Sequence, residues 1–215
     1  MRGRRATHAA RSLATLGMTL DFDSVQRVRA RIARAQQLAA IRFRDAFAAG
    51  ALPPVAHLRI QAAALIECAE GVKLDGEIAY DVIGDIVTPY VERGRPVYPY
   101  FEVARTPSAI FEYWLIISEI ESSTSWKMTR VIASSEEYAE ALNRVQSPQI
   151  VRALVASFLP DVDIRPDGTA MLEATVYARA GEERIERRTL LLDVMNELHF
   201  HGRELIAEGR GGVRG

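Results

Sequence analysis

Apolar residues recur every three or four positions along residues 24–49, which predicts one long helix in this segment. Ser24 can cap its N-terminus, and Gly50 supplies a C-terminal stop. The apolar stripe consists of Val25, Val28, Ile32, Ala35, Leu38 or Ala39, and Ala46. Because the arginines of the segment fall mainly beside or opposite the stripe, the helix can bury one face and present a cationic one.

Helical periodicity and start signals continue through most of the next hundred residues. They predict helices at 54–70, between Asp75 and Pro89, at 107–120, at 134–145 and at 148–159. Residues 110–120 are also rich in β-branched and aromatic types, so a strand is the alternative there. Residues 126–133 alternate well enough for a short strand.

The apolar period changes to two after the turn that ends at Gly168. Three strands are predicted, at 169–179, 184–195 and 197–207, with Asn196 in the second turn. The predicted fold class is therefore α+β, with a helical N-terminal two-thirds followed by a C-terminal three-stranded antiparallel β-meander over 169–208. We expect one domain over residues 21–208, a disordered segment or extension at 1–20, and a disordered tail at 209–215.

Charge is divided unevenly along the chain. Residues 1–49 hold ten arginines and three acids, a balance of +7, and the remainder carries −8, so the whole chain is at −1. A basic segment needs a counter-charge, which the acidic body, a second copy or an external anion could supply. Nucleic-acid binding through the basic N-terminal arm is a weaker alternative, because the acidic body would repel phosphates and no aromatic residue lies among the arginines before Phe43.

Composition narrows the setting of the protein. No apolar run approaches the roughly 20 residues of a membrane span, and Cys68 is the single cysteine, so an internal disulfide and a cysteine-based zinc site are excluded. These features favour a cytoplasmic protein. The acid-free, arginine-containing first twenty residues also resemble an organellar transit peptide, with a disordered tail or an upstream extension before Met18 as the alternatives.

The best chemical candidate is the segment Glu197–His201, where alternate residues of a strand would place Glu197, His199 and His201 on one face. Such a face suits metal ligation or acid–base chemistry. The tandem histidines are similar to the metal motif of cupins, but Glu204 follows too closely and no second motif exists. We therefore expect no metal and no cofactor.

Helices that precede a terminal meander resemble the element order of the cone-shaped α+β folds related to ketosteroid isomerase. The resemblance implies a curved sheet whose polar face lines a pocket. A pocket enzyme or small-ligand binder of this kind would use Tyr177, Asp193, His199 and His201, with His199 transferring a proton and Asp193 orienting it. Element order is the whole of the resemblance, and no motif identifies a family.

Because no nucleotide-binding, hydrolase or metalloprotease motif is present, the favoured function is interaction or assembly, as a homo-oligomer or with a protein partner. Half of the aromatic residues lie between Tyr90 and Trp126, in and around a proline-stiffened segment that suits an interface. The expected contact residues are Arg27, Arg31, Arg34, Arg42, Tyr98, Tyr100 and Trp114.

Overall fold

The structure is a computed structural model that describes residues 16–50, 55–83, 86–91, 95–124, 128–145, 147–152, 157–180 and 182–209. The described residues contain four helices and eleven strands. The helices are α1 (Phe22–Ala48), α2 (Ala56–Cys68), α3 (Pro107–Thr124) and α4 (Ser135–Arg144). The helices predicted at 24–49, 54–70, 107–120 and 134–145 are thus confirmed.

Seven antiparallel strands form one sheet. Their order is β1 (Leu16–Thr19), β8 (Asp161–Ile164), β9 (Ala170–Ala180), β10 (Glu182–Leu192), β11 (Leu198–Gly209) and β7 (Pro148–Ile150), with β6 (Met128–Val131) paired to the far end of β9. Two small sheets accompany it. In them β2 (Val72–Leu74) pairs with β5 (Phe101–Val103), which follows the 3₁₀ turn η1 (Tyr98–Tyr100), and β3 (Ala79–Ile83) pairs with β4 (Ile86–Tyr90).

The predicted fold class is wrong, because a helical two-thirds and a three-stranded meander do not describe this arrangement. Strands β9, β10 and β11 occupy the segments expected for the meander, but they form the centre of the seven-stranded sheet. Of the strands that complete it, β8 comes directly before β9 in the chain, the other three come from more distant parts, and each has only three or four residues. The alternation over 126–133 predicted β6 correctly, whereas β1, β7 and β8 are too short for a period of two to stand out in the sequence.

One predicted helix is replaced by a hairpin. The segment between Asp75 and Pro89 forms β3 and β4, which pair from Ala79 with Tyr90 to Ile83 with Ile86. Its apolar residues are mostly β-branched, and branching at Cβ favours extended backbone over helix.

The helix predicted at 148–159 is also wrong. Pro148–Ile150 instead forms the edge strand β7 beside β11, and residues 153–156 lie outside the described part of the chain. Ser147 has a φ of 48°, in the left-handed region, so a right-handed helix does not start there.

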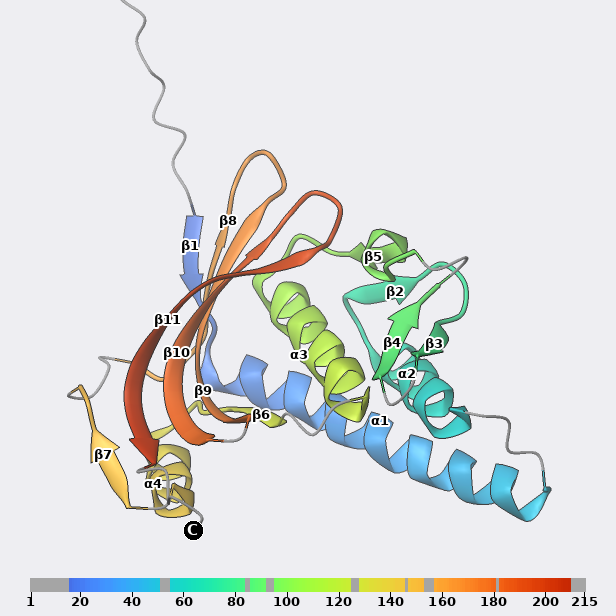
Figure 1. Ribbon diagram of the computed structural model, residues 1–215. Coiled ribbons are helices and arrows are strands. Elements are labelled where there is room, and N and C mark those ends of the chain that lie inside the picture. Colours follow the sequence, from blue (N-terminus) through green and yellow to red (C-terminus); the bar gives the residue numbers. More distant parts are fainter. Residues whose placement is uncertain are drawn as a thin grey trace, which may run out of the picture.

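The large sheet curls around α3 (Figure 1). Two β-bulges in the β10–β11 pairing, at Ile185/Glu186 and at Thr189/Leu190, increase the local bend of these strands. Alanines at 170, 174 and 178 on the inner face of β9 let the helix approach closely. This inner face, α3 and the buried side of α1 share the main hydrophobic core.

The outer face of the sheet carries a second, smaller core under α4. It consists of Ile132, Tyr138, Ala141, Val145, Tyr177, Ile185, Ile206 and Ala207. Ser134 caps α4 by accepting a hydrogen bond from the Glu137 N–H, as predicted. The two faces of the long strands therefore have different partners, α3 inside and α4 outside.

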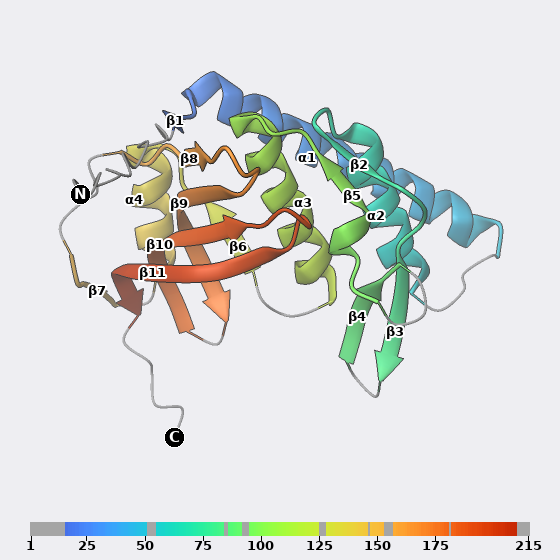
Figure 2. The same cartoon turned by 90° about the horizontal axis from the view of Figure 1, so that it is seen from above.

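Helix α1 runs along the back of the molecule, behind both the curled sheet and α2 (Figure 2). Its N-cap is Asp21, not the predicted Ser24: the Asp21 carboxylate accepts a 2.6 Å hydrogen bond from the Ser24 N–H. That hydrogen bond lowers the pKa of Asp21 below its usual value.

Arginines of α1 pair with acidic residues of the same chain. Arg29 binds Glu137 of α4 at 2.5 Å and the Val131 carbonyl at 2.6 Å. Arg31 donates from Nε to Glu112 of α3 at 2.5 Å. The basic N-terminal segment thus finds part of its counter-charge in the acidic body.

No helix within the described ranges is both long enough and apolar enough to cross a membrane. Residues 16–19 form β1 and pair with β8. The predictions for residues 1–15 and 210–215 lie outside the described residues, and so does Trp126.

Candidate functional site

A cleft of about 460 Å³ lies between α3 and the inner face of the curled sheet. We call it the arginine cleft. One end is charged and contains Arg184, Glu186, Arg188 and Arg203. The other end is apolar and is lined by Trp114, Ile117, Leu190, Leu198 and Phe200.

Strand β10 produces this division by itself. Its even-numbered side chains face inward, because they pair with the buried even-numbered residues of β9. Along that face the residues change from Arg184, Glu186 and Arg188 to Leu190 and Leu192. One strand face therefore carries both a charged half and an apolar half.

Glu186 organises the charged end. Its side chain is 1% exposed, with Oε1 2.6 Å from Arg188 Nε and Oε2 2.8 Å from Arg184 Nε. Arg203 of β11 lies farther away, with Nη1 4.0 Å from Oε2. One buried carboxylate thus stands among three guanidinium groups.

The hydrogen bonding at this end is incomplete. Arg188 makes two hydrogen bonds, since it also donates from Nη1 to Thr129 Oγ1 at 3.2 Å. Arg184 Nε and Glu186 Oε2 lie at ion-pair distance but are without a hydrogen bond of good geometry. Buried polar atoms are normally satisfied, and these two have an ion-pair contact in place of a hydrogen bond.

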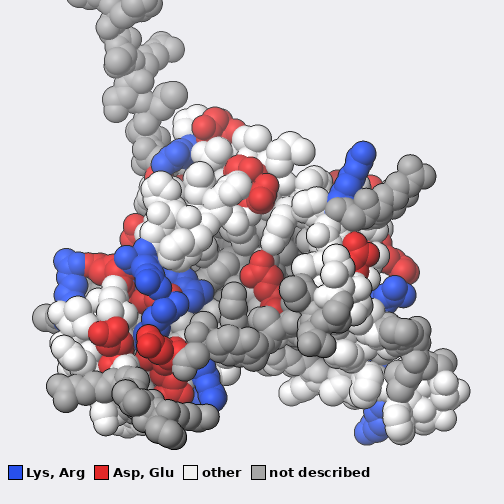
Figure 3. Space-filling model, viewed as in Figure 1, with Lys and Arg blue, Asp and Glu red and all other residues white. Residues whose placement is uncertain are grey.

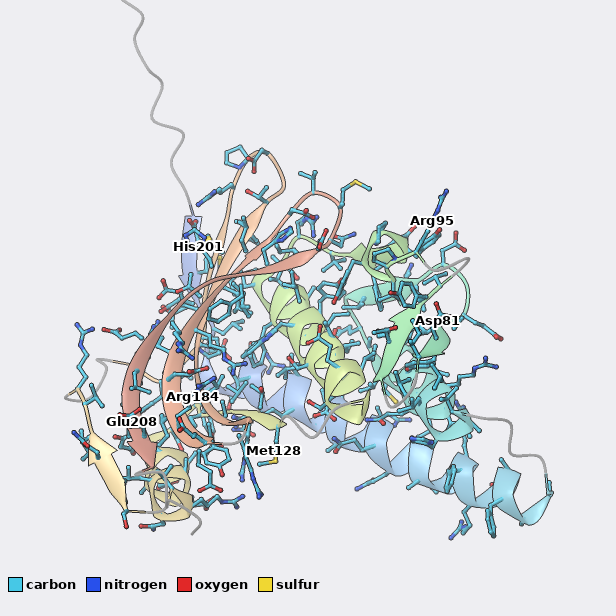
Figure 4. The ribbon with its side chains drawn as sticks, viewed as in Figure 1. Asp81, Arg95, Met128, Arg184, His201 and Glu208 are labelled. Atoms are coloured by element: carbon cyan, nitrogen blue, oxygen red, sulfur yellow. The ribbon has the colours of Figure 1, made fainter. Side chains whose placement is uncertain are left out.

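The figures show the same arrangement. Blue Lys and Arg side chains gather over the curled strands, beside a hollow that faces α3 (Figure 3). In Figure 4, Arg184 and Met128 lie near the lower ends of these strands, whereas His201 lies farther up β11.

Two of the four predicted catalytic residues meet, but away from the cleft. Nε2 of His199 lies 3.1 Å from Oδ2 of Asp193 at the β10–β11 turn, where the imidazole is nearly half exposed. Oδ1 of Asp193 accepts the N–H groups of Met195 and Glu197 at 2.8 and 2.9 Å. Asp193 therefore closes the turn, a structural task that its side chain performs alongside the contact to His199.

Desolvation opposes ionisation of Asp193, but the hydrogen bonds from His199 and from the turn N–H groups outweigh it, so the pKa of this carboxyl lies below its usual value. Asp193, Glu197 and His199 are also near enough to share a cation, with ligand atoms within 4.8 Å of one another. Glu197 and His199 are exposed to solvent.

The other two predicted catalytic residues lie elsewhere. Tyr177 is buried on the outer face of the sheet, in the core under α4, where desolvation and Glu183 raise the pKa of its hydroxyl. His201 is exposed at the β-bulge between Thr189 and Leu190. The structure therefore does not bring Tyr177 or His201 to the Asp193–His199 pair.

The predicted contact residues are only partly available. Arg31 and Arg42 are paired with acids of the same chain, Arg42 with Glu67 at 2.7 Å. Arg27 donates to the Ser24 hydroxyl, Arg34 is exposed, and Tyr98 donates to Glu121 at 3.0 Å. Trp114 is buried in the wall of the arginine cleft, and Tyr100 is half-buried in η1.

The charged residues of the cleft were missed at the sequence level. A signal for them exists. Arg184, Glu186 and Arg188 lie on the same strand face as Leu190, because residues two apart in a strand share a face. This face pairs with a face of the preceding strand that is entirely small or apolar. A run of charged residues on the core side of a strand indicates a cavity lined by those side chains, because an isolated charge is costly to bury.

Comparison of the chain with models of known protein families, with curated protein sequences and with solved structures finds no match.

Proposed function

We propose that this protein binds a small organic anion in the arginine cleft. The observation that carries the proposal is a cationic site with an apolar extension inside a curled sheet. Its volume of about 460 Å³ falls in the range of small-molecule pockets, which combine mostly apolar walls with a few placed polar groups. We place this binding function in the cytoplasm, because a chain with one cysteine forms no internal disulfide.

Electrostatics support an anion as the ligand. Arginine is the residue best suited to bind carboxylates and phosphates, since its planar fork donates two parallel hydrogen bonds. Glu186 keeps Arg184 and Arg188 in place inside the cleft. The site is consequently preorganised, which lowers the entropic cost of binding.

Binding of anilinonaphthalene sulfonate, a fluorescent organic anion, tests this proposal. We expect its fluorescence to rise with a dissociation constant in the micromolar range, and Ser118→Trp to weaken binding by about tenfold or more, because Ser118 lines the cleft on α3. The matched control is Ser135→Trp, at an exposed position of α4, which should bind as the wild type does. Equal binding by all three proteins would place the probe outside the cleft and contradict the proposal.

We also propose that two copies associate through the distal part of α1. Phe47 is 67% exposed there and Phe43 38%. They continue a stripe formed by Gln36, Ala40, Phe43 and Phe47, whose spacing of four, three and four residues is that of a coiled-coil seam. The favoured contact residues are thus apolar, and differ from the predicted arginines.

The stripe is complementary to itself, as a two-fold interface requires. In an antiparallel pair centred between Ala40 and Phe43, each Phe43 faces the partner's Ala40, and each Phe47 faces the partner's Gln36. Large residues therefore oppose smaller or flexible ones, which allows the two helices to pack closely.

Light scattering tests the association. The wild-type chain is expected at twice the mass of one chain, and Phe43→Glu/Phe47→Glu at the mass of one, because two carboxylates would be buried against apolar residues. Ile83→Glu, at an exposed position of the β3–β4 hairpin, serves as the control and should remain a dimer. A monomeric wild type, or a double variant that still dimerises, would disprove this interface.

A further inference from the structure

The charge of the arginine cleft exceeds what one negative group can neutralise. Arg184, Arg188 and Arg203 carry three positive charges at the charged end, and Glu186 supplies one negative charge. At the rim, Arg179 and Glu121 balance each other in formal charge. A net charge of +2 therefore faces the interior of the cleft.

We propose that the ligand carries a dianionic head group of the phosphate-monoester type on an apolar, ring-bearing body. This inference rests on the proposed function and names the chemical class of its ligand. A phosphate monoester carries about −1.5 to −2 charges at neutral pH, which matches the cleft. A monocarboxylate would leave one guanidinium charge without a counter-charge.

The hydrogen-bond donors at the charged end fit such a head group. Ser118, Ser122 and Thr129 line the cleft with hydroxyl groups. Thr129 Oγ1 accepts from Arg188, which leaves its own hydrogen to donate. Guanidinium and hydroxyl donors together can serve three terminal oxygens, the number that a phosphate monoester has and a carboxylate lacks.

Arg203 is the guanidinium best placed to move onto the ligand. Arg184 and Arg188 contact Glu186 directly and are only 26% and 19% exposed, whereas the Arg203 side chain is 54% exposed and 4.0 Å from that carboxylate. It can therefore shift toward a head group without breaking a hydrogen bond that the described part of the chain shows.

The apolar end has room for a ring. Phe200 projects from the inner face of β11 opposite Leu190, yet it is 59% exposed. Trp114 and Ile117 of α3 line the other side. Glu186 and Leu190 are four residues apart on an extended strand, about 13 Å, so the head group and a two-ring body fit end to end.

Isothermal titration calorimetry tests the inference with three probes that share one naphthalene ring and differ in the head group. They are naphthyl phosphate, naphthoate and naphthol, each substituted at the same ring position. We expect naphthyl phosphate to bind about tenfold or more tightly than naphthoate, and naphthoate more tightly than naphthol. Inorganic phosphate should bind more weakly than naphthyl phosphate, because it lacks the apolar body.

Two variants locate the effect. Arg203→Gln should weaken naphthyl phosphate binding by about tenfold and affect naphthol little. Arg165→Gln removes the same charge at the exposed β8–β9 turn and should leave all affinities unchanged. An equal loss in both variants would show that overall charge, and not the cleft, attracts the anion, and would overturn the inference.

The remaining outcomes separate the two proposals. If naphthoate binds as tightly as naphthyl phosphate and Ser118→Trp abolishes both, the cleft binds anions but the dianionic head group is wrong. If inorganic phosphate binds as tightly as naphthyl phosphate, the apolar body is wrong. If none of the three naphthyl probes binds, the proposed function fails together with the inference.

Discussion

Replacing Glu112 by alanine is expected to lower the free energy of unfolding by about 4 kcal/mol. Glu112 lies on α3 and is 1% exposed. Its Oε1 accepts from Arg31 Nε at 2.5 Å, and its Oε2 accepts the N–H groups of Glu70 and Gly71 at 3.1 and 2.9 Å. One carboxylate therefore joins α1, α3 and the loop between α2 and β2.

The substitution leaves three donors without an acceptor. Arg31 keeps its contact to the exposed Glu70 at 2.8 Å, but its Nε and the two backbone N–H groups lose theirs. These three hydrogen bonds are part-buried, and a fully buried donor without a partner costs about 1–3 kcal/mol. Repacking cannot close the gap easily, because the loop already touches α3: a Cβ on Gly71 would lie 2.3 Å from Ala109 Cβ.

Urea unfolding followed by circular dichroism measures this loss. Glu67→Ala is the matched control, because Glu67 also pairs with an arginine of α1, Arg42, but both partners are about half exposed. An exposed pair contributes about 0–1 kcal/mol. Equal losses in the two variants would mean that burial of the Glu112 network does not matter to stability.

Replacing Glu186 by glutamine is expected to cost about 3 kcal/mol of unfolding free energy. The amide keeps the shape of the side chain but removes the single counter-charge among Arg184, Arg188 and Arg203. Three guanidinium groups would then repel one another in a partly dry cleft, where charge interactions are stronger than in water.

The same change should strengthen anion binding, since the net charge of the cleft rises from +2 to +3. Naphthyl phosphate is accordingly expected to raise the melting temperature of Glu186→Gln more than that of the wild type. Glu173→Gln is the control: Glu173 pairs with Arg187 at 3.2 Å and is 44% exposed. If Glu186→Gln is no less stable than Glu173→Gln, Glu186 is not the centre of the charged end.

Local signals in the sequence predicted several elements correctly. Pro107 after Thr106 starts α3, and Ser134 caps α4. Both depend on residues within one turn of the helix end, where the unpaired N–H groups must be satisfied. The alternation over 169–179 likewise marks β9, because a strand that buries one face has a period of two.

Interactions between residues that are far apart in the chain could not be predicted from the sequence pattern. Arg31 and Glu112 are 81 positions apart. The apolar residues between 79 and 90 fit the pattern of a helix, but this segment pairs as a hairpin. The candidate site was misplaced for the same reason. His199 and Asp193 are neighbours in a turn, and that local contact was predicted, whereas the cleft needs α3 to lie inside the curl of β10 and β11.

The sequence by itself determined the starts of α3 and α4, the alternating faces of the long strands and the supply of arginines, because each follows from residues that are close along the chain. Only the tertiary structure decided which face of β10 is the inner one. Burial is the physical reason, because the small apolar face of β9 must pack against α3. The pairing register of β9 and β10 then places Arg184, Glu186 and Arg188 on the same side of the sheet. These charges thereby become the lining of a cleft instead of a solvated surface.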